Sequence, residues 1–273
     1  MIASLYEGTF SVGADRQFKP INPDDKPPFG SFKVTIHPYL IADDHMTALI
    51  DAGPGTFGPL NHYAIMTENL SRHGVTPDDI EYVFCSHLHT DHVGGLLKPH
   101  GHSFELSFPN ARIQLSGREW EQFKKKANEN RKTDAIRWAT FLENHADLTF
   151  TEDHPDGTGP VYMETIGGHT EFSQAIFYNN GGLKAMMLGD VLARPEIINR
   201  RFVAKFDFDA VQSRNKRAFF LEKALRENYY ILTFHGSNGA IIYLKGYDPK
   251  KGYLVEHITS GVIRQGPPPA PET

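Results

Sequence analysis

The stretch His87-Leu88-His89-Thr90-Asp91-His92 decides the fold of this chain. Neutral imidazole and carboxylate groups are the ligands that Zn²⁺ and similar divalent ions accept in proteins. The strand-like run Tyr82 to Cys85 comes directly before the stretch. Where that strand ends, an irregular turn lets the first two histidines point to one position, while the aspartate and the third histidine point to a neighbouring one. The stretch therefore predicts a site for metal ions, and Gly94-Gly95 behind it permits a tight turn.

A pair of metal ions needs more ligands than these four, and three further candidates each follow apolar, strand-like sequence. They are His169 in Gly167-Gly168-His169-Thr170, Asp190 in Leu188-Gly189-Asp190, and His235 in Thr233-Phe234-His235-Gly236. Polar residues at strand ends are typical of sites where several strands converge. Each candidate is weak by itself, since an aspartate such as Asp190 is often a turn residue. Together with the first stretch, metal binding becomes the favoured interpretation.

With these residues the chain resembles the metallo-β-lactamase superfamily, and within it the lactonase-like dinuclear hydrolases. That group includes N-acyl-homoserine lactonases and methyl-parathion-hydrolase-like enzymes. The resemblance extends from about Phe32 to Ile258. It implies an α/β (α+β) fold, a four-layer αβ/βα sandwich with the site at one edge of two sheets.

The resemblance also implies a role for each ligand and a pair of divalent cations, expected to be Zn²⁺, with Mn²⁺ or Fe²⁺ as alternatives. His87, His89 and His169 would hold the first metal, Asp91, His92 and His235 the second, and Asp190 would bridge both. Asp51 matches the family's structural aspartate, which supports the motif loop. The chain departs from the pattern at Ala193, where the best-known homoserine lactonases carry tyrosine, and at Glu171-Phe172-Ser173, where the family often has Pro-Gly-His.

The function expected from this site is hydrolysis of a carboxylic ester or lactone by a metal-bridging hydroxide. Asp91 would be the catalytic residue that orients the hydroxide and moves its proton to the leaving group. Three alternatives remain open. The same site could cleave phosphotriesters or phosphodiesters, the fold could carry a mononuclear iron oxygenase, or the chain could hold metal without turnover.

Composition narrows the classes of partner. Hydrophobic residues make up 40% and charged residues 22% of the 273, which is an ordinary globular balance. The formal net charge is −5 and no basic block dominates, so binding of nucleic acid is not favoured. The single Cys85 excludes an intramolecular disulfide, and no run of about 18 apolar residues could span a bilayer. We expect a cytoplasmic protein with a small-molecule substrate, no membrane contact and a possible homodimer.

Hairpins and helices alternate along the chain, which predicts one domain over residues 1–273 with sheets covered by helices. Residues 14–31 are predicted to be an irregular segment and residues 266–273, rich in proline, a disordered tail. The predicted strand pairs are Phe32–Ile41 with Met46–Asp51, and Gln174–Tyr178 with Leu183–Leu188. The predicted helices cover Tyr63–Arg72, Gly117–Lys126, Asp134–Asn144 and a segment from Asp209 to about Glu227. The helix predicted from Gly117 follows a capping-box pattern that begins at Ser116.

Overall fold

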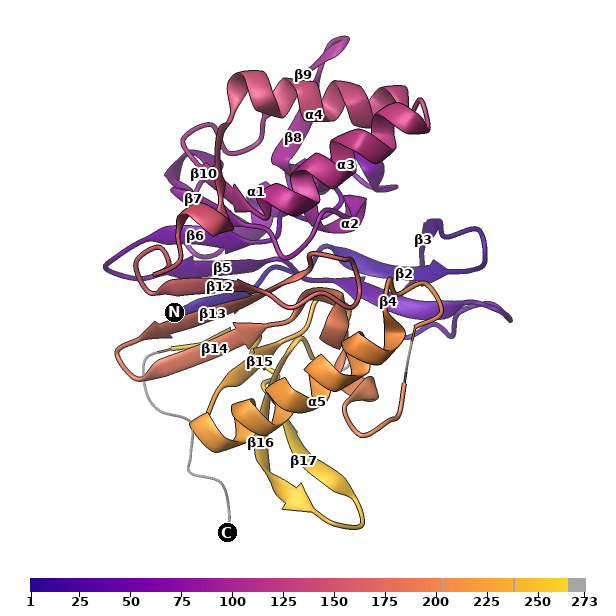
Figure 1. Cartoon of the computed structure of the whole chain (residues 1–273), viewed down its shortest axis with the longest axis vertical. Helices are drawn as coiled ribbons and strands as arrows, with labels where there is room; N and C mark the ends of the chain where they lie inside the picture. Colours follow the sequence, from indigo (N-terminus) through magenta and orange to yellow (C-terminus); the bar gives the residue numbers. More distant parts are fainter. Residues whose placement is uncertain (203, 238, 265–273) are drawn as a thin grey trace.

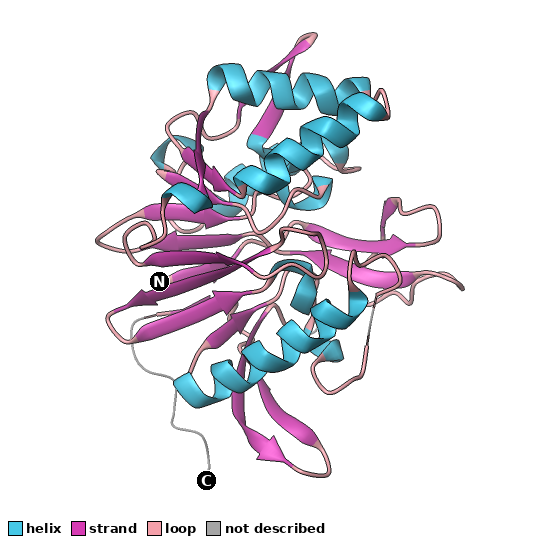
Figure 2. Ribbon diagram, in the orientation of Figure 1, coloured by secondary structure: helices cyan, strands magenta, loops and turns pink. Residues whose placement is uncertain are grey.

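The computed structural model describes residues 1–202, 204–237 and 239–264. The predicted tail at 266–273 lies outside these residues. Two β-sheets stack face to face, and helices cover the outer face of each (Figure 1; Figure 2). Within the described residues, no helix is both long and apolar enough to cross a membrane.

The first sheet has seven strands and the second has six. In spatial order the first contains β11 (Asp147–Phe150), β10 (Arg112–Leu115), β7 (Tyr82–Phe84), β6 (Thr47–Ile50), β5 (Tyr39–Ala42), β1 (Ile2–Ser4) and β18 (Val262–Ile263). The second contains β12 (Val161–Thr165), β13 (Gln174–Asn180), β14 (Leu183–Met187), β15 (Tyr230–Leu232), β16 (Ile241–Asp248) and β17 (Gly252–His257). Two small sheets complete the fold: β3 (Phe18–Pro20), β2 (Gly8–Val12) and β4 (Phe32–Ile36) form one, and β8 (Leu97–His100) with β9 (Ser103–Leu106) the other.

The layer between the two large sheets is the main hydrophobic core. Ile50 and Phe84 reach it from the first sheet, and Ile176, Met187 and Leu232 from the second. All five side chains are almost completely buried. Burial of this apolar surface is the main stabilising contribution that holds the two sheets together.

Two further clusters fix the helices on the outer faces. Leu70, Trp120 and Trp138 come from α1 (His62–Ser71), α3 (Gly117–Glu129) and α4 (Thr133–His145), and they pack in one cluster with residues of the first sheet. Phe220 and Leu221 of α5 (Ala210–Glu227) pack on the second sheet. The order helix, sheet, sheet, helix confirms the predicted four-layer αβ/βα sandwich.

The cap predicted at Ser116 is present, and Asp209, where the last predicted helix begins, is a second cap. The Ser116 hydroxyl accepts a hydrogen bond from the Glu119 backbone N–H at the start of α3. The Asp209 carboxylate accepts from the backbone N–H groups of Val211 and Gln212 at the start of α5. A capping side chain satisfies amide groups that have no partner inside the helix, so both helix starts could be predicted from local sequence.

Two predictions about the first forty residues need correction. The predicted strand Phe32–Ile41 is two strands, because Pro38 has no N–H to donate and the chain changes sheet there. β4 pairs with β2, whereas β5 pairs with β1 and β6. The segment 14–31, predicted to be irregular, contains the short strand β3, which pairs with β2. That pairing depends on a distant partner strand, which local composition does not indicate.

Beneath the loop after β6, a carboxyl and an imidazole are buried against each other. The Glu7 Oε2 and His62 Nδ1 atoms are 2.7 Å apart, and both side chains are 0% exposed. Burial raises the pKa of the Glu7 carboxyl from 4.5 to about 7, and the contact with His62 only partly opposes this. The native state therefore keeps a proton on Glu7 in a pH range where the unfolded chain has released it.

This buried carboxyl predicts a specific dependence of stability on pH. Between pH 4.5 and 7 the native state binds the extra proton, so the free energy of unfolding falls as pH rises through that range. Glu7→Gln keeps an acceptor for His62 and removes the titration. We expect the wild type to lose about 2–3 kcal/mol relative to this variant between roughly pH 5 and 8, measured by urea unfolding. Equal pH profiles for the wild type, Glu7→Gln and the exposed control Glu222→Gln would contradict the prediction.

Candidate metal centre

Seven polar side chains from both large sheets meet at one edge of the sandwich. Four of them belong to the stretch after β7, which continues into the short helix α2 (Thr90–Val93). The other three follow strands of the second sheet: His169 comes after β12, Asp190 after β14 and His235 after β15. The structure thus brings together all seven residues that the sequence singled out.

The seven side chains form two groups, and in each the candidate ligand atoms lie within 4.8 Å of one another. The first group is His87, His89, His169 and Asp190; the second is Asp91, His92 and His235. Asp190 faces both groups. Its Oδ2 atom is 3.4 Å from His169 Nε2, and its Oδ1 atom is 3.4 Å from both His92 Nε2 and His235 Nε2.

The spacing within the first group fits the ligands of a tetrahedral cation. His89 Nδ1 lies 3.1 Å from His87 Nε2 and 3.0 Å from His169 Nε2. Nitrogen ligands at about 2.0–2.1 Å from a tetrahedral Zn²⁺ would be roughly 3.3 Å from each other. The arrangement therefore matches three nitrogens around one shared position.

Four of the five histidines are oriented by a bond on the ring nitrogen that faces away from the centre. The Nδ1 partners are Ser86 Oγ for His87 (3.1 Å), Asp51 Oδ2 for His92 (2.7 Å), Asp207 Oδ1 for His169 (2.8 Å) and the Thr35 carbonyl for His235 (2.8 Å). Each of these bonds leaves Nε2 directed inward. Metal-binding histidines usually have such outer partners, which fix the ring and its tautomer.

The protonation states of His87, His89 and Asp91 also suit cations. Burial lowers the pKa of His89 to about 4, and neighbouring histidines act in the same direction, so its imidazole is neutral. Burial likewise lowers the pKa of His87. Burial would raise the pKa of Asp91, but the adjacent His92 and His235 outweigh it and hold the carboxyl ionised. Neutral imidazole and ionised carboxylate are the forms that bind metal. Burial would lower the pKa of His92 and His235, but Asp91 and Asp190 outweigh it and raise the pKa of His235 to about 9, so a cation bound there would displace a proton from each ring.

Two buried polar atoms at the centre lack the hydrogen bonds that such atoms normally make. His92 Nε2 and Asp190 Oδ1 are inaccessible to solvent and have no hydrogen-bond partner among the described residues. An unsatisfied buried polar group costs about 1–3 kcal/mol. Both atoms face the position between the two groups, so the cluster suits a dinuclear divalent metal site.

The glycines behind the motif permit close backbone packing that no other residue allows. A Cβ atom on Gly95 would lie 1.9 Å from the Ala52 carbonyl oxygen, and one on Gly94 would lie 2.1 Å from the Pro54 carbonyl oxygen. Nearby, Cys85 is fully buried and burial raises its thiol pKa, as expected for a small core residue. The close contacts of Gly94 and Gly95 show that the motif loop packs directly onto the turn that follows Asp51.

Sequence reasoning missed Asp207, whose carboxylate bonds the His169 ring and is only 4% exposed. It lies in a loop without a recognisable pattern. We expect Asp207→Ala to weaken metal binding by about 10- to 100-fold, because the His169 ring loses its orienting acceptor. Asp207→Asn should recover part of the loss, since an amide oxygen can still accept from Nδ1. Titration against a chromophoric chelator measures this, and an affinity equal to that of the exposed control Asp156→Asn would contradict it.

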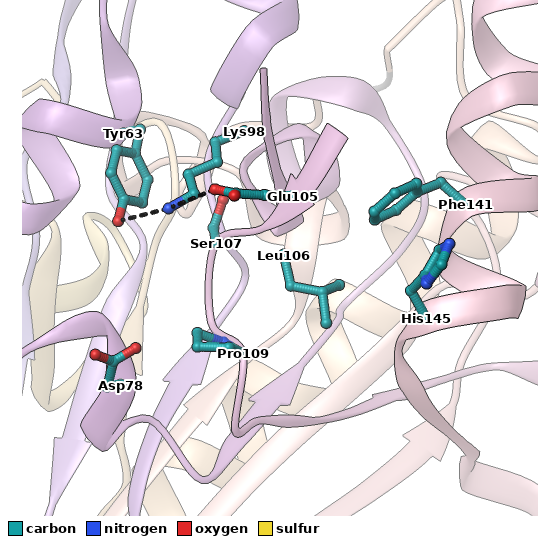
Figure 3. A pocket seen from close by; sticks show the side chains of 9 residues that line it. All are labelled: Tyr63, Asp78, Lys98, Glu105, Leu106, Ser107, Pro109, Phe141 and His145. Carbon is teal, nitrogen blue, oxygen red and sulfur yellow. Dashed lines mark hydrogen bonds and ion pairs between the residues drawn. The ribbon is translucent and has the colours of Figure 1, made fainter. Parts of the chain in front are cut away.

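A hollow of about 440 Å³ contains none of the seven residues (Figure 3). Its lining comes from α1, the turn at residues 77–79, α4 and the β8–β9 hairpin region: Tyr63, Asp78, Lys98, Glu105, Leu106, Ser107, Pro109, Phe141 and His145. Lys98 Nζ lies 3.2 Å from Glu105 and 3.4 Å from the Tyr63 hydroxyl. The lysine in this hollow is therefore already partnered by the protein itself.

Comparisons with known proteins agree with this architecture. The model of the metallo-beta-lactamase superfamily matches residues 34–235. A comparison with curated protein sequences gave no match. Among solved structures, a probable metal-dependent hydrolase from Staphylococcus aureus has a TM-score of 0.70 at 22% identity, over 89% of this chain and 91% of that one.

Two other solved structures are similar over most of their length. AidC, a dizinc quorum-quenching lactonase, has a TM-score of 0.73 at 19% identity, covering 94% of this chain and 93% of that one. The hydrolase AbOPH has a TM-score of 0.71 at 20% identity, covering 94% of each chain. At these identities the likeness shows a shared fold. Because the family model spans most of the sequence, the chain belongs to the metallo-beta-lactamase superfamily.

Proposed function

We propose that the chain is a dinuclear metal-dependent hydrolase that cleaves a carboxylic ester or lactone. The observation that carries this proposal is the position of Asp190, whose two carboxylate oxygens each face a different group of candidate ligands. His87, His89 and His169 would hold one cation, Asp91, His92 and His235 the other, and Asp190 would bridge them. Zn²⁺ is the proposed ion because imidazole nitrogen and carboxylate oxygen dominate the set. A pair of such ions, when bound, lowers the pKa of water toward neutrality and polarises the carbonyl of a substrate.

Asp91 is the proposed catalytic residue. Its Oδ2 atom lies 3.3 Å from His235 Nε2 and 3.7 Å from His92 Nε2, and its side chain is 15% exposed. The carboxylate is therefore held at the centre while one side remains open to solvent. In hydrolysis it would accept a proton from the attacking water as the new carbon–oxygen bond forms. It would then return that proton to the leaving alkoxide as the acyl–oxygen bond breaks.

Similar structures support an ester or lactone as the bond that is cleaved. One of them is a dizinc lactonase in complex with its product, and another is a hydrolase. Phosphotriesters and phosphodiesters remain the second candidate, since the same arrangement can direct water at phosphorus. The second ligand group of Asp91, His92 and His235 favours a dinuclear hydrolase over a mononuclear iron oxygenase.

Metal content and substrate class can be tested on a single preparation. We expect about two zinc-like ions per chain by plasma mass spectrometry, and turnover of esters or lactones in a panel that also contains organophosphates. His87→Ala should lose metal and turnover together, whereas the exposed control His102→Ala should keep both. One iron per chain, or activity only on phosphoesters, would overturn the assignment.

A further inference from the structure

The segment that follows Asp190 runs from one side of the metal centre to the other. At its start, the Ala193 carbonyl accepts a hydrogen bond of 2.8 Å from the His235 backbone N–H. Toward its end, the ring of Phe206 lies 6.0 Å from the ring of His169. In Figure 1 the segment leads from β14 to the start of α5, near β4. The segment therefore borders the centre both at His235 and at His169.

This segment is basic in a chain that is acidic as a whole. Residues 191–206 contain a single carboxylate, Glu196, and four basic residues, Arg194, Arg200, Arg201 and Lys205, whereas the whole chain has a formal net charge of −5. We call these four residues the basic rim. Within the described part of the chain, none of the four has a carboxylate within ion-pair distance, although other basic residues, such as Arg112, do. Unpaired cations beside a buried site attract anions toward it.

Arg194 is the most constrained member of the basic rim. Its guanidinium carbon lies 5.8 Å from the centre of the Phe32 ring and 6.0 Å from that of Phe202. The side chain is half-buried, and no hydrogen bond links it to another described residue. Two aromatic faces thus hold the planar group while its N–H edges stay available for a carboxylate.

The position of Phe32 relates Arg194 to the metal centre. Phe32 begins β4, and the Thr35 carbonyl of the same strand accepts from His235 Nδ1 at 2.8 Å. Arg194 also directly follows Ala193, whose carbonyl bonds the His235 backbone N–H, so Arg194 borders the His235 side of the centre.

A buried arginine of α5 holds the backbone on both sides of Arg194 in place. Arg217 of α5 is 4% exposed and donates to the carbonyl oxygens of Val191 (3.2 Å) and Phe202. Those two carbonyls lie on either side of Arg194 in the sequence. The bonds hold the chain against α5 on both sides of Arg194, so Arg194 keeps a defined position relative to Asp190.

Exposed aromatic side chains lie on both the Arg194 side and the His169 side of the centre. Phe32 is 42% exposed and Phe206 is 53% exposed. Large exposed apolar side chains beside a site are typical of surfaces that contact a ligand. A substrate could thus place an apolar body on these rings and a charged end on the guanidinium.

We propose that the basic rim, through Arg194, selects ester substrates that carry an anionic group at the far end of an apolar acyl chain. This inference rests on the proposed function, because it describes the acyl part of the same substrate. The scissile carbonyl would lie at the metal centre and the distal anion at the Arg194 N–H groups. An arginine–carboxylate pair in a partly desolvated site is strong enough for a clear preference.

The test uses two matched series of 4-nitrophenyl esters, with distal carboxylates in one and methyl ends in the other, from pentanedioyl to nonanedioyl length. We expect the wild type to prefer the carboxylate series at the longer lengths by roughly 10- to 100-fold in kcat/KM. Arg194→Gln should abolish that ratio, and Arg194→Lys should restore part of it. Lys250→Gln, which removes the same charge in the β16–β17 turn, should keep the full ratio.

A binding experiment separates this inference from the hydrolase assignment. Calorimetry with nonanedioate and nonanoate should show tighter binding of the dicarboxylate to the wild type, a difference that Arg194→Gln removes. If the esters are not cleaved but this difference is found, the hydrolase proposal fails and the role of the basic rim stands. If both series are cleaved equally, or Arg194→Gln keeps the wild-type ratio and binding difference, the inference is wrong.

Discussion

Replacing Asp190 with asparagine is expected to abolish retention of the metal pair and to reduce turnover by at least about a thousandfold. The carboxylate is the one side chain among the seven whose two oxygens face the two ligand groups separately, each at 3.4 Å from a histidine nitrogen. An amide has a single oxygen, and its NH₂ group has no lone pair to offer. The variant could therefore serve one cation at most.

Plasma mass spectrometry after dialysis gives the metal content of Asp190→Asn, and ester hydrolysis gives its turnover. Asp24→Asn, in an exposed loop, is the matched control and should behave as the wild type. Far-ultraviolet circular dichroism verifies that the variant remains folded. If Asp190→Asn retained two ions per chain and full turnover, Asp190 would not be the bridging ligand.

The candidate ligands could be predicted because each carries a local signal. Four of them lie within six consecutive residues, and their spacing alone indicates metal. Asp190 and His235 closely follow the apolar sequence of β14 and β15, two parallel neighbours whose carboxyl ends lie at the same edge. A polar residue just beyond a buried strand is therefore placed at that edge by the strand itself.

The supporting residues could not be predicted, because their roles arise from contacts between distant segments. Asp207 reaches His169 across 38 positions, and Glu119 at the start of α3 accepts from the Leu88 backbone N–H at 3.2 Å across 31. Neither residue belongs to a metal-binding motif. The contact of the Arg194 guanidinium with an aromatic ring likewise depends on Phe32, which comes from the other half of the chain. Such pairs can be identified only when the three-dimensional arrangement of the segments that contain them is known.

The change of sheet at Pro38 is a feature of the fold that local sequence likewise did not predict. The sequence of residues 32–41 alternates and favours a strand throughout, so local propensity indicates one element. The two halves pair with different strands, the first with β2 and the second with β1. Pairing between distant strands decides the outcome, and the proline marks where it changes.

Asp51→Asn is expected to destabilise the protein by about 2–4 kcal/mol and to weaken the metal group that contains His92. Asp51 is fully buried, and its carboxylate accepts from the Ser86 backbone N–H at 2.7 Å, from the Ser86 hydroxyl at 2.8 Å and from His92 Nδ1 at 2.7 Å. An amide can reproduce part of this set, but its NH₂ group then faces a donor. The variant would leave the motif loop without its charged anchor.

Asparagine is the right substitution because the Asp51 backbone has a φ of 56°. Asparagine tolerates this left-handed region, whereas alanine would add backbone strain and obscure the effect of the hydrogen bonds. Urea unfolding with and without a chelator separates the two consequences, since the lost hydrogen bonds weaken the fold even without metal. Asp44→Asn, in the exposed β5–β6 turn, is the control. If Asp51→Asn unfolded at the same urea concentration as this control, Asp51 would not be the support of the motif loop.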